Sequence, residues 1–372
     1  MSSEELLFSL LRNHFFGEPL TFDRLSHQEF SLLMRLARKQ TVGGLTVGAL
    51  IQAGISLDRV DAIAVFSRLK MIEAVNRQVD DELISLETIL SAASIRHLVF
   101  KGQTLARLYP HPAERMPGDI DFYCDEVDFL KAVRLLEDIW GVEIGESESS
   151  QHREFTHNDV PFEMHFCMIR FNNATIRRYW ERLLAEQERW QAMIGEVQVP
   201  ILNPTLNVLY TFLHLYHHLV ELGVGLRQFC DVLCLLHAYS DRIDGRALDA
   251  HLTAMGFRRA FCAVGWILVH RMGLPVTEFP LPIAEKDKRY EQRILSIVFA
   301  GGNFGKDMHR TAVRSGMFYY VEALIIKLAH YQLFWKLSRK EIVSTVVKEI
   351  PRKIWAAFYK GSSFCTVQKG QK

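Results

Sequence analysis

Two aspartates lie two residues apart in a segment that otherwise has the composition of a buried strand, Gly118-Asp119-Ile120-Asp121-Phe122-Tyr123. Residues two apart in a strand point to the same face, so Asp119 and Asp121 are expected to share one pocket. Two bare carboxylates there would repel each other, and one of them would stay protonated. A divalent cation removes this conflict because hard cations prefer oxygen ligands. The spacing therefore favours a site for Mg²⁺, or Mn²⁺, on this strand.

The distribution of apolar residues divides the chain into regions. From Glu4 to about Ala93 apolar residues recur every three or four positions, and the stretch 61–90, which lacks Gly and Pro, predicts one long helix. Short strands and helices then alternate, and beyond Asn203 the helical pattern returns, with its last helix expected at 317–358. We predict an α+β protein with an N-terminal helical region at 1–95, a small mixed-sheet α/β core at 96–202, a larger C-terminal helical region at 203–360 and a disordered tail at 361–372.

The α/β segment supplies a third carboxylate. Its pattern predicts strands at 97–100, at 118–123 and near Val142, a helix at 126–139, and a hairpin of 153–157 and 161–166. Asn158-Asp159 would form the turn because both side chains tolerate turn conformations. Glu163 lies in the second hairpin strand, which can pair beside the strand of the two aspartates. It could complete a two-metal site or accept the proton of an attacking hydroxyl.

Taken together, these motifs resemble a known family. The residues that carry the likeness are Val99-Phe100-Lys101-Gly102, Leu105-Ala106, Tyr109-Pro110, Arg115, Gly118-Asp119-Ile120-Asp121, Phe162-Glu163-Met164-His165, Arg227 and Asp231. They resemble the uncharacterised nucleotidyltransferase family of the DNA polymerase beta superfamily over about residues 90 to 235. The resemblance implies that Asp119, Asp121 and Glu163 bind the metal and that a nucleoside triphosphate is the substrate. In that superfamily a Gly followed by Gly or Ser usually precedes the two acids. In this chain Lys101-Gly102 stands in its place.

Other residues are expected to bind the nucleotide: Lys101, Gly102, Arg115, Gly118, His165 and Arg227. The Lys101 ammonium and the backbone at Gly102 would hold phosphates. Arg115 is either a triphosphate clamp or a surface arginine, and His165 is either near the metal or a hydrogen-bonded core histidine.

Three further helical residues have competing interpretations. Arg227 either contacts the nucleotide or acceptor, or forms an architectural pair with Asp231 one helical turn away. His214 and His218 have ligand spacing on one helix face, but without a completing ligand set we interpret them as structural.

Bulk properties exclude some classes of protein. The six cysteines form no CxxC pair, which argues against structural zinc and disulfides. No apolar run is long enough for a membrane span, and the acidic start lacks a secretory signal, so we expect a cytoplasmic protein. The segment after Gly301 carries about thirteen Lys and Arg against four acids. This basic segment has no accompanying nucleic-acid motif, so it gives no firm nucleic-acid signal.

Two hypotheses of different class follow. In the first, the protein is an enzyme that transfers a nucleoside monophosphate from a triphosphate to an acceptor hydroxyl, with release of pyrophosphate. The acceptor could be a small molecule, a sugar, a protein side chain or RNA. In the second, the protein is a catalytically silent nucleotide-binding or protein-interaction module on the same fold. The presence of all three acids favours the enzyme, because a silent module would be recognised by the loss of one of them.

Overall fold

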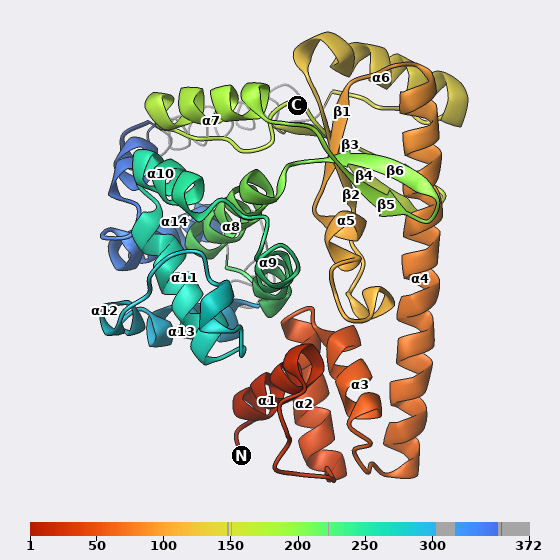
Figure 1. Ribbon diagram of the computed structural model, residues 1–372, viewed down its shortest axis with the longest axis vertical. Coiled ribbons are helices and arrows are strands. Elements are labelled where there is room, and N and C mark those ends of the chain that lie inside the picture. The colour runs from red at the N-terminus through yellow and green to blue at the C-terminus, as the bar shows by residue number, and fades with distance from the viewer. Residues whose placement is uncertain (147–148, 150, 222, 303–316, 349–350, 352–372) are drawn as a thin grey trace, which may run out of the picture.

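The computed structural model describes residues 1–146, 149, 151–221, 223–302, 317–348 and 351. Its first region is helical, as predicted, with α1 (Ser3–Phe16), α2 (His27–Lys39), α3 (Gly43–Gln52) and α4 (Arg59–Ala92). The start of α2 is fixed by a capping box, in which the Ser26 hydroxyl accepts from the Glu29 amide and the Glu29 carboxylate accepts from the Ser26 amide. The long helix expected at 61–90 is confirmed by α4, which extends along one side of the molecule (Figure 1).

A mixed four-stranded sheet forms the α/β part, which confirms the predicted fold class. Its strands stand in the order β1-β2-β4-β3, and they span β1 (His97–Phe100), β2 (Ile120–Cys124), β3 (His152–His157) and β4 (Val160–His165). β2 pairs antiparallel with β1 and parallel with β4. The predicted hairpin turn is confirmed, because Asn158 and Asp159 both have positive φ, 46° and 61°. The connecting segments are α5 (Gly102–Ala106), η1 (Pro112–Glu114) and α6 (Glu126–Trp140).

Two details of the α/β prediction need correction. No strand forms near Val142: Gly141 ends α6 in the left-handed conformation, and the Ile144 amide donates to the Glu137 carboxylate instead of to a neighbouring strand. Conversely, the sequence reading missed one helix and a second sheet, α7 (Ala174–Glu186), β5 (Trp190–Ile194) and β6 (Val197–Ile201). The turn of this two-stranded sheet contains Gly195 at φ 56°.

The described residues beyond Asn203 are mostly helical, as predicted. Their elements are α8 (Pro204–Glu221), α9 (Leu226–Ala238), α10 (Gly245–Met255), α11 (Arg258–His270), η2 (Val276–Glu278), α12 (Glu285–Lys288), α13 (Glu291–Gly301) and α14 (Met317–Phe334). The single helix expected at 317–358 is wrong, because the chain turns at 335–338 before a further helical stretch at 339–348. The tail predicted to be disordered, 361–372, lies outside the described residues.

The buried apolar residues form two clusters that meet along α4. The larger cluster joins the N-terminal helices to the C-terminal ones and includes Leu7, Phe8, Phe212 and Phe261. The smaller cluster lies against the sheet and is built from the second half of α4, from α6 and from the strands. α4 therefore anchors the sheet to the helical part of the molecule (Figure 1). None of the helices in the described residues is long and apolar enough to cross a membrane.

The close approach of α3 to the η1 loop gives a stability prediction. A Cβ built on Gly44 would overlap the carbonyl oxygen of Glu114, whereas one built on Gly145 meets no described atom within 4 Å. Alanine normally favours a helix over glycine by up to about 1 kcal/mol. We expect Gly44→Ala instead to lower the free energy of unfolding by about 1–3 kcal/mol, because overpacking forces the loop away from α3.

Urea denaturation of wild type, Gly44→Ala and the control Gly145→Ala measures this effect. The control should unfold at the wild-type urea midpoint. A Gly44→Ala protein as stable as wild type would contradict the packing described here.

Candidate active site

Three carboxylates are brought together by the register of β2 and β4. Asp121 lies directly opposite Glu163 in the parallel ladder, and Asp119 immediately precedes β2. One oxygen from each of the three side chains lies within 4.8 Å of the other two. Asp121 is buried, whereas Asp119 and Glu163 are half-buried and face a cavity. The structure thus collects the three acids that the sequence singled out, in an arrangement that can hold a divalent cation.

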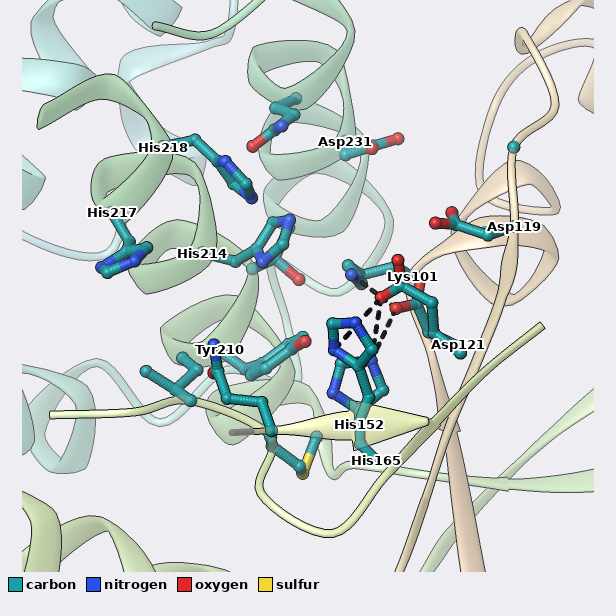
Figure 2. Close-up of a pocket in the computed structure, with 18 of the residues that line it drawn as sticks. Lys101, Asp119, Asp121, His152, His165, Tyr210, His214, His217, His218 and Asp231 are labelled. Carbon is teal, nitrogen blue, oxygen red and sulfur yellow. Dashed lines mark hydrogen bonds and ion pairs between the residues drawn. The ribbon is translucent and has the colours of Figure 1, made fainter. Parts of the chain in front are cut away.

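A lysine and a histidine contact these carboxylates. The Lys101 ammonium lies 2.8 Å from Asp121 Oδ1, and His165 Nε2 lies 3.0 Å from the same oxygen and 3.2 Å from Glu163 Oε2 (Figure 2). Lys101 has φ 60°, a conformation that costs energy in a residue with a Cβ. The Gly102 that follows has φ 44° and approaches the Asp119 backbone so closely that a Cβ would lie 3.3 Å from its carbonyl oxygen. The predicted Lys101-Gly102 pair therefore forms a sharp corner beside the acids.

The electrostatics of the acids fit a cation. The Asp121 carboxylate, and then burial, raise the pKa of Asp119 to about 6. Burial alone would raise the pKa of Asp121 too, but the Lys101 ammonium and the hydrogen bond with His165 outweigh it and lower that pKa to about 2. One carboxylate is thus held ionised while its neighbour resists ionisation. This residual repulsion is what a divalent cation would relieve, so the donor set fits Mg²⁺ or Mn²⁺.

The carboxylates lie on one side of a cavity of about 280 Å³, and helices form the opposite wall. Tyr210, His214, His217 and His218 of α8 face the strand that bears the acids across this space (Figure 2). Burial, then neighbouring positive groups, lower the pKa of His218 to about 3 and that of His214 well below its ordinary value. The histidines that the sequence reading treated as structural therefore line the cavity as neutral imidazoles.

Arg115 holds the loop that carries Asp119. It is 3% exposed, so the interpretation as a surface arginine is wrong. Its Nε and Nη2 donate to the two oxygens of Asp231 at 2.7 and 2.9 Å, and the Tyr109 hydroxyl donates to Asp231 at 2.6 Å. The pair expected between Arg227 and Asp231 is not made, because Asp231 is turned toward Arg115 on the neighbouring loop.

Arg227 and Gly118 pack against each other at the edge of the cavity. Arg227 Nη1 donates to the Met116 carbonyl at 3.2 Å, and its Nε has no hydrogen-bond partner among the described residues. A Cβ on Gly118 would lie 3.4 Å from Arg227 Nη1. Both predicted residues thus line the cavity, with one donor of Arg227 unused by the protein. Sequence reasoning missed His152 and Tyr210, which also line it; the placement of His152 opposite His165 in the hairpin was the available signal.

Comparison with known proteins shows the family of this chain. The chain matches the family described as uncharacterised nucleotidyltransferases over residues 26–273, about two thirds of its length. It belongs to that family, and the match is wider than the likeness visible in the motifs. A crystal structure described as an antigenic nucleotidyltransferase-like protein from Paracoccidioides brasiliensis is similar at 13% identity, over 55% of this chain and 93% of that chain, with a TM-score of 0.32. No curated protein matches the chain.

The buried Arg115–Asp231 pair gives the next prediction. We expect Arg115→Ala to lower the free energy of unfolding by about 3–5 kcal/mol, because it leaves the Asp231 carboxylate buried without its cation. The matched control is Arg177→Ala, which removes an exposed pair with Glu181 at 3.7 Å and should cost less than about 1 kcal/mol. Urea denaturation of both variants measures the difference. Equal losses in the two variants would show that Arg115 does not hold the loop.

Proposed function

We propose that this protein is a metal-dependent nucleotidyltransferase that transfers a nucleoside monophosphate from a nucleoside triphosphate to an acceptor hydroxyl, with release of pyrophosphate. The observation that carries the proposal is the cluster of Asp119, Asp121 and Glu163, whose oxygens lie within 4.8 Å of one another at the cavity. Family membership supports the same class of chemistry.

In this proposal Asp119, Asp121 and Glu163 hold Mg²⁺ or Mn²⁺. The metal, when bound, neutralises the negative charge that develops on the phosphates during transfer. Glu163 is the more exposed of the paired acids, with 26% of its side chain accessible against 2% for Asp121. This exposure supports a role for Glu163 as the acceptor of the proton from the attacking hydroxyl.

Cationic and backbone groups beside the acids would bind the triphosphate. Lys101, at the corner formed with Gly102, can exchange its ion pair with Asp121 for one with a phosphate oxygen. Arg227 has an unused Nε at the cavity, and Gly118 lets the loop approach it closely. Arg115 would act by positioning this loop, because its own guanidinium is occupied by Asp231. His165 would orient Asp121 and Glu163 through its Nε2.

The three regions of the chain would have different roles. The core at 96–202 would hold metal and nucleotide, while the C-terminal helical region at 203–360 would recognise the acceptor. Its wall offers neutral hydrogen-bonding groups to the cavity, among them the Tyr210 hydroxyl, which has no hydrogen-bond partner within the described part of the chain. The region at 1–95 would support the core and the C-terminal helical region, since its helices share the larger apolar cluster with the C-terminal helices.

One observation favours the alternative of a catalytically silent nucleotide-binding or protein-interaction module. The Lys101 ammonium already lies 2.8 Å from Asp121 and offsets its charge without any metal. In such a module the lysine would take the place of the cation permanently.

The transfer reaction itself is tested with label from each of the four triphosphates. Purified wild type and Asp119→Asn/Asp121→Asn are incubated in cell extract with Mg²⁺ or Mn²⁺, and pyrophosphate release and label incorporation are measured. We expect wild type alone to transfer label and the variant to lose at least about 100-fold in rate, because the phosphate charge is no longer neutralised. Binding of a triphosphate without turnover would support the silent module. The absence of binding would contradict both.

A second prediction separates the two roles of Lys101. We expect Lys101→Met to lower the Tm in the absence of metal, because Asp121 loses its buried cationic partner. Added Mn²⁺ should then raise the Tm of Lys101→Met by several degrees more than that of wild type, since metal and ammonium compete for the same carboxylate. Thermal unfolding with and without Mn²⁺ measures both effects. If Mn²⁺ changes neither Tm, the acids do not form a metal site.

A further inference from the structure

Two imidazoles and a carboxylate are placed together by the pairing of β3 with β4. His152 lies directly opposite His165 in the antiparallel ladder, so their side chains share one face of the sheet. Glu163 precedes His165 by two residues in β4 and points to the same face. The backbone register therefore gathers the three side chains independently of the pairing between β2 and β4.

The distances within this group suit metal ligation. One ligand atom from each of His152, Glu163 and His165 lies within 4.8 Å of the other two. His152 Nδ1 is 3.8 Å from Glu163 Oε2, and His165 Nε2 is 3.2 Å from the same oxygen. Without metal His165 Nε2 donates to Asp121 and Glu163, and it would release this proton to solvent when its lone pair binds the ion. The two imidazole rings lie with centroids 4.8 Å apart.

The hydrogen bonds of His152 prepare it as a ligand. Its Nε2 lies 3.0 Å from the Glu154 carboxylate and is placed to donate to it, which leaves the lone pair on Nδ1. That Nδ1 is buried, and among the described residues it has no hydrogen-bond partner. A histidine that binds metal through one nitrogen and donates to a carboxylate with the other is the usual arrangement at protein metal sites.

We propose that His152, Glu163 and His165 form a second divalent metal site, which selects a transition-metal ion such as Zn²⁺ or Co²⁺ over Mg²⁺. The selectivity follows from the donors, because imidazole nitrogen suits transition metals, whereas Mg²⁺ requires oxygen. Glu163 belongs to both clusters and would bridge this ion to the one held by Asp119 and Asp121. The bridging rests on the proposed function, but binding of the ion by the two imidazoles does not.

Cobalt binding to the purified full-length chain tests the site. We expect wild type to bind Co²⁺ with visible absorption bands that excess Mg²⁺ leaves in place. His152→Ala should bind it at least about tenfold more weakly and lose those bands. The matched control is His217→Ala, which removes an exposed imidazole from the helical wall of the same cavity. It should keep the wild-type affinity and bands. Equal affinity and spectra in wild type and His152→Ala would overturn the proposal.

A measurement on wild type alone avoids any dependence on the folding of a variant. X-ray absorption at the zinc edge, with zinc below one equivalent, should show Zn–N distances near 2.0 Å and the outer-shell signal of imidazole. A purely oxygen shell would overturn the site. The transfer assay reports separately on the proposed function: a protein that holds zinc through imidazole but transfers no nucleotide would retain this site and contradict the enzyme.

Discussion

The parallel pairing of β2 with β4 is the constraint on which the site depends, because it places Asp121 directly opposite Glu163. A shift of one residue in this register would turn one of the carboxylates to the other face of the sheet. The apolar residues between the polar ones resist such a shift. Phe122 and Phe162 are fully buried in the cluster against α4 and α6, so the same alternation that fills this core presents the acids to the cavity. The alternation of residues along β2 and β4 thus determines both the packing of the core and the geometry of the site.

The helical region completes the site from the opposite side. Asp231 of α9 receives hydrogen bonds from both Arg115 and Tyr109, and these buried contacts fix the loop that leads into Asp119. α8 and α9 then form the cavity wall that faces the sheet (Figure 2). Because the loop is held by the helices and the strand by the sheet, the acids have a defined position only when both parts are assembled. The shared apolar cluster favours that assembly.

Local patterns predicted the elements that local interactions determine. The helix at 61–90, the hairpin turn at Asn158-Asp159 and the spacing of the acids could all be recognised from the sequence, since each depends on residues near in the chain. The fold class and the family followed from the same patterns, and both are confirmed. The metal and nucleotide roles assigned to the individual residues remain predictions.

Features that depend on distant contacts were missed or misassigned. Helical spacing predicts Arg227 as the partner of Asp231, but the partner is Arg115, more than one hundred residues earlier in the chain. His152 can be recognised as a residue of the site only from its place opposite His165, and this requires the hairpin register to be known. The interpretation of His214 and His218 as structural stays a prediction, and a helix pattern alone cannot show that their face borders a cavity.

The central claim is that Asp119, Asp121 and Glu163 bind the metal that serves nucleotide transfer. The most direct test is the anomalous diffraction of crystals grown with Mn²⁺ and a triphosphate analogue that cannot be cleaved between the α- and β-phosphates. We expect a manganese peak coordinated by oxygens of these three side chains and of the α-phosphate, with the Lys101 ammonium moved from Asp121 to a phosphate oxygen. A bound nucleotide without manganese at the acids, with Lys101 still paired to Asp121, would contradict this claim.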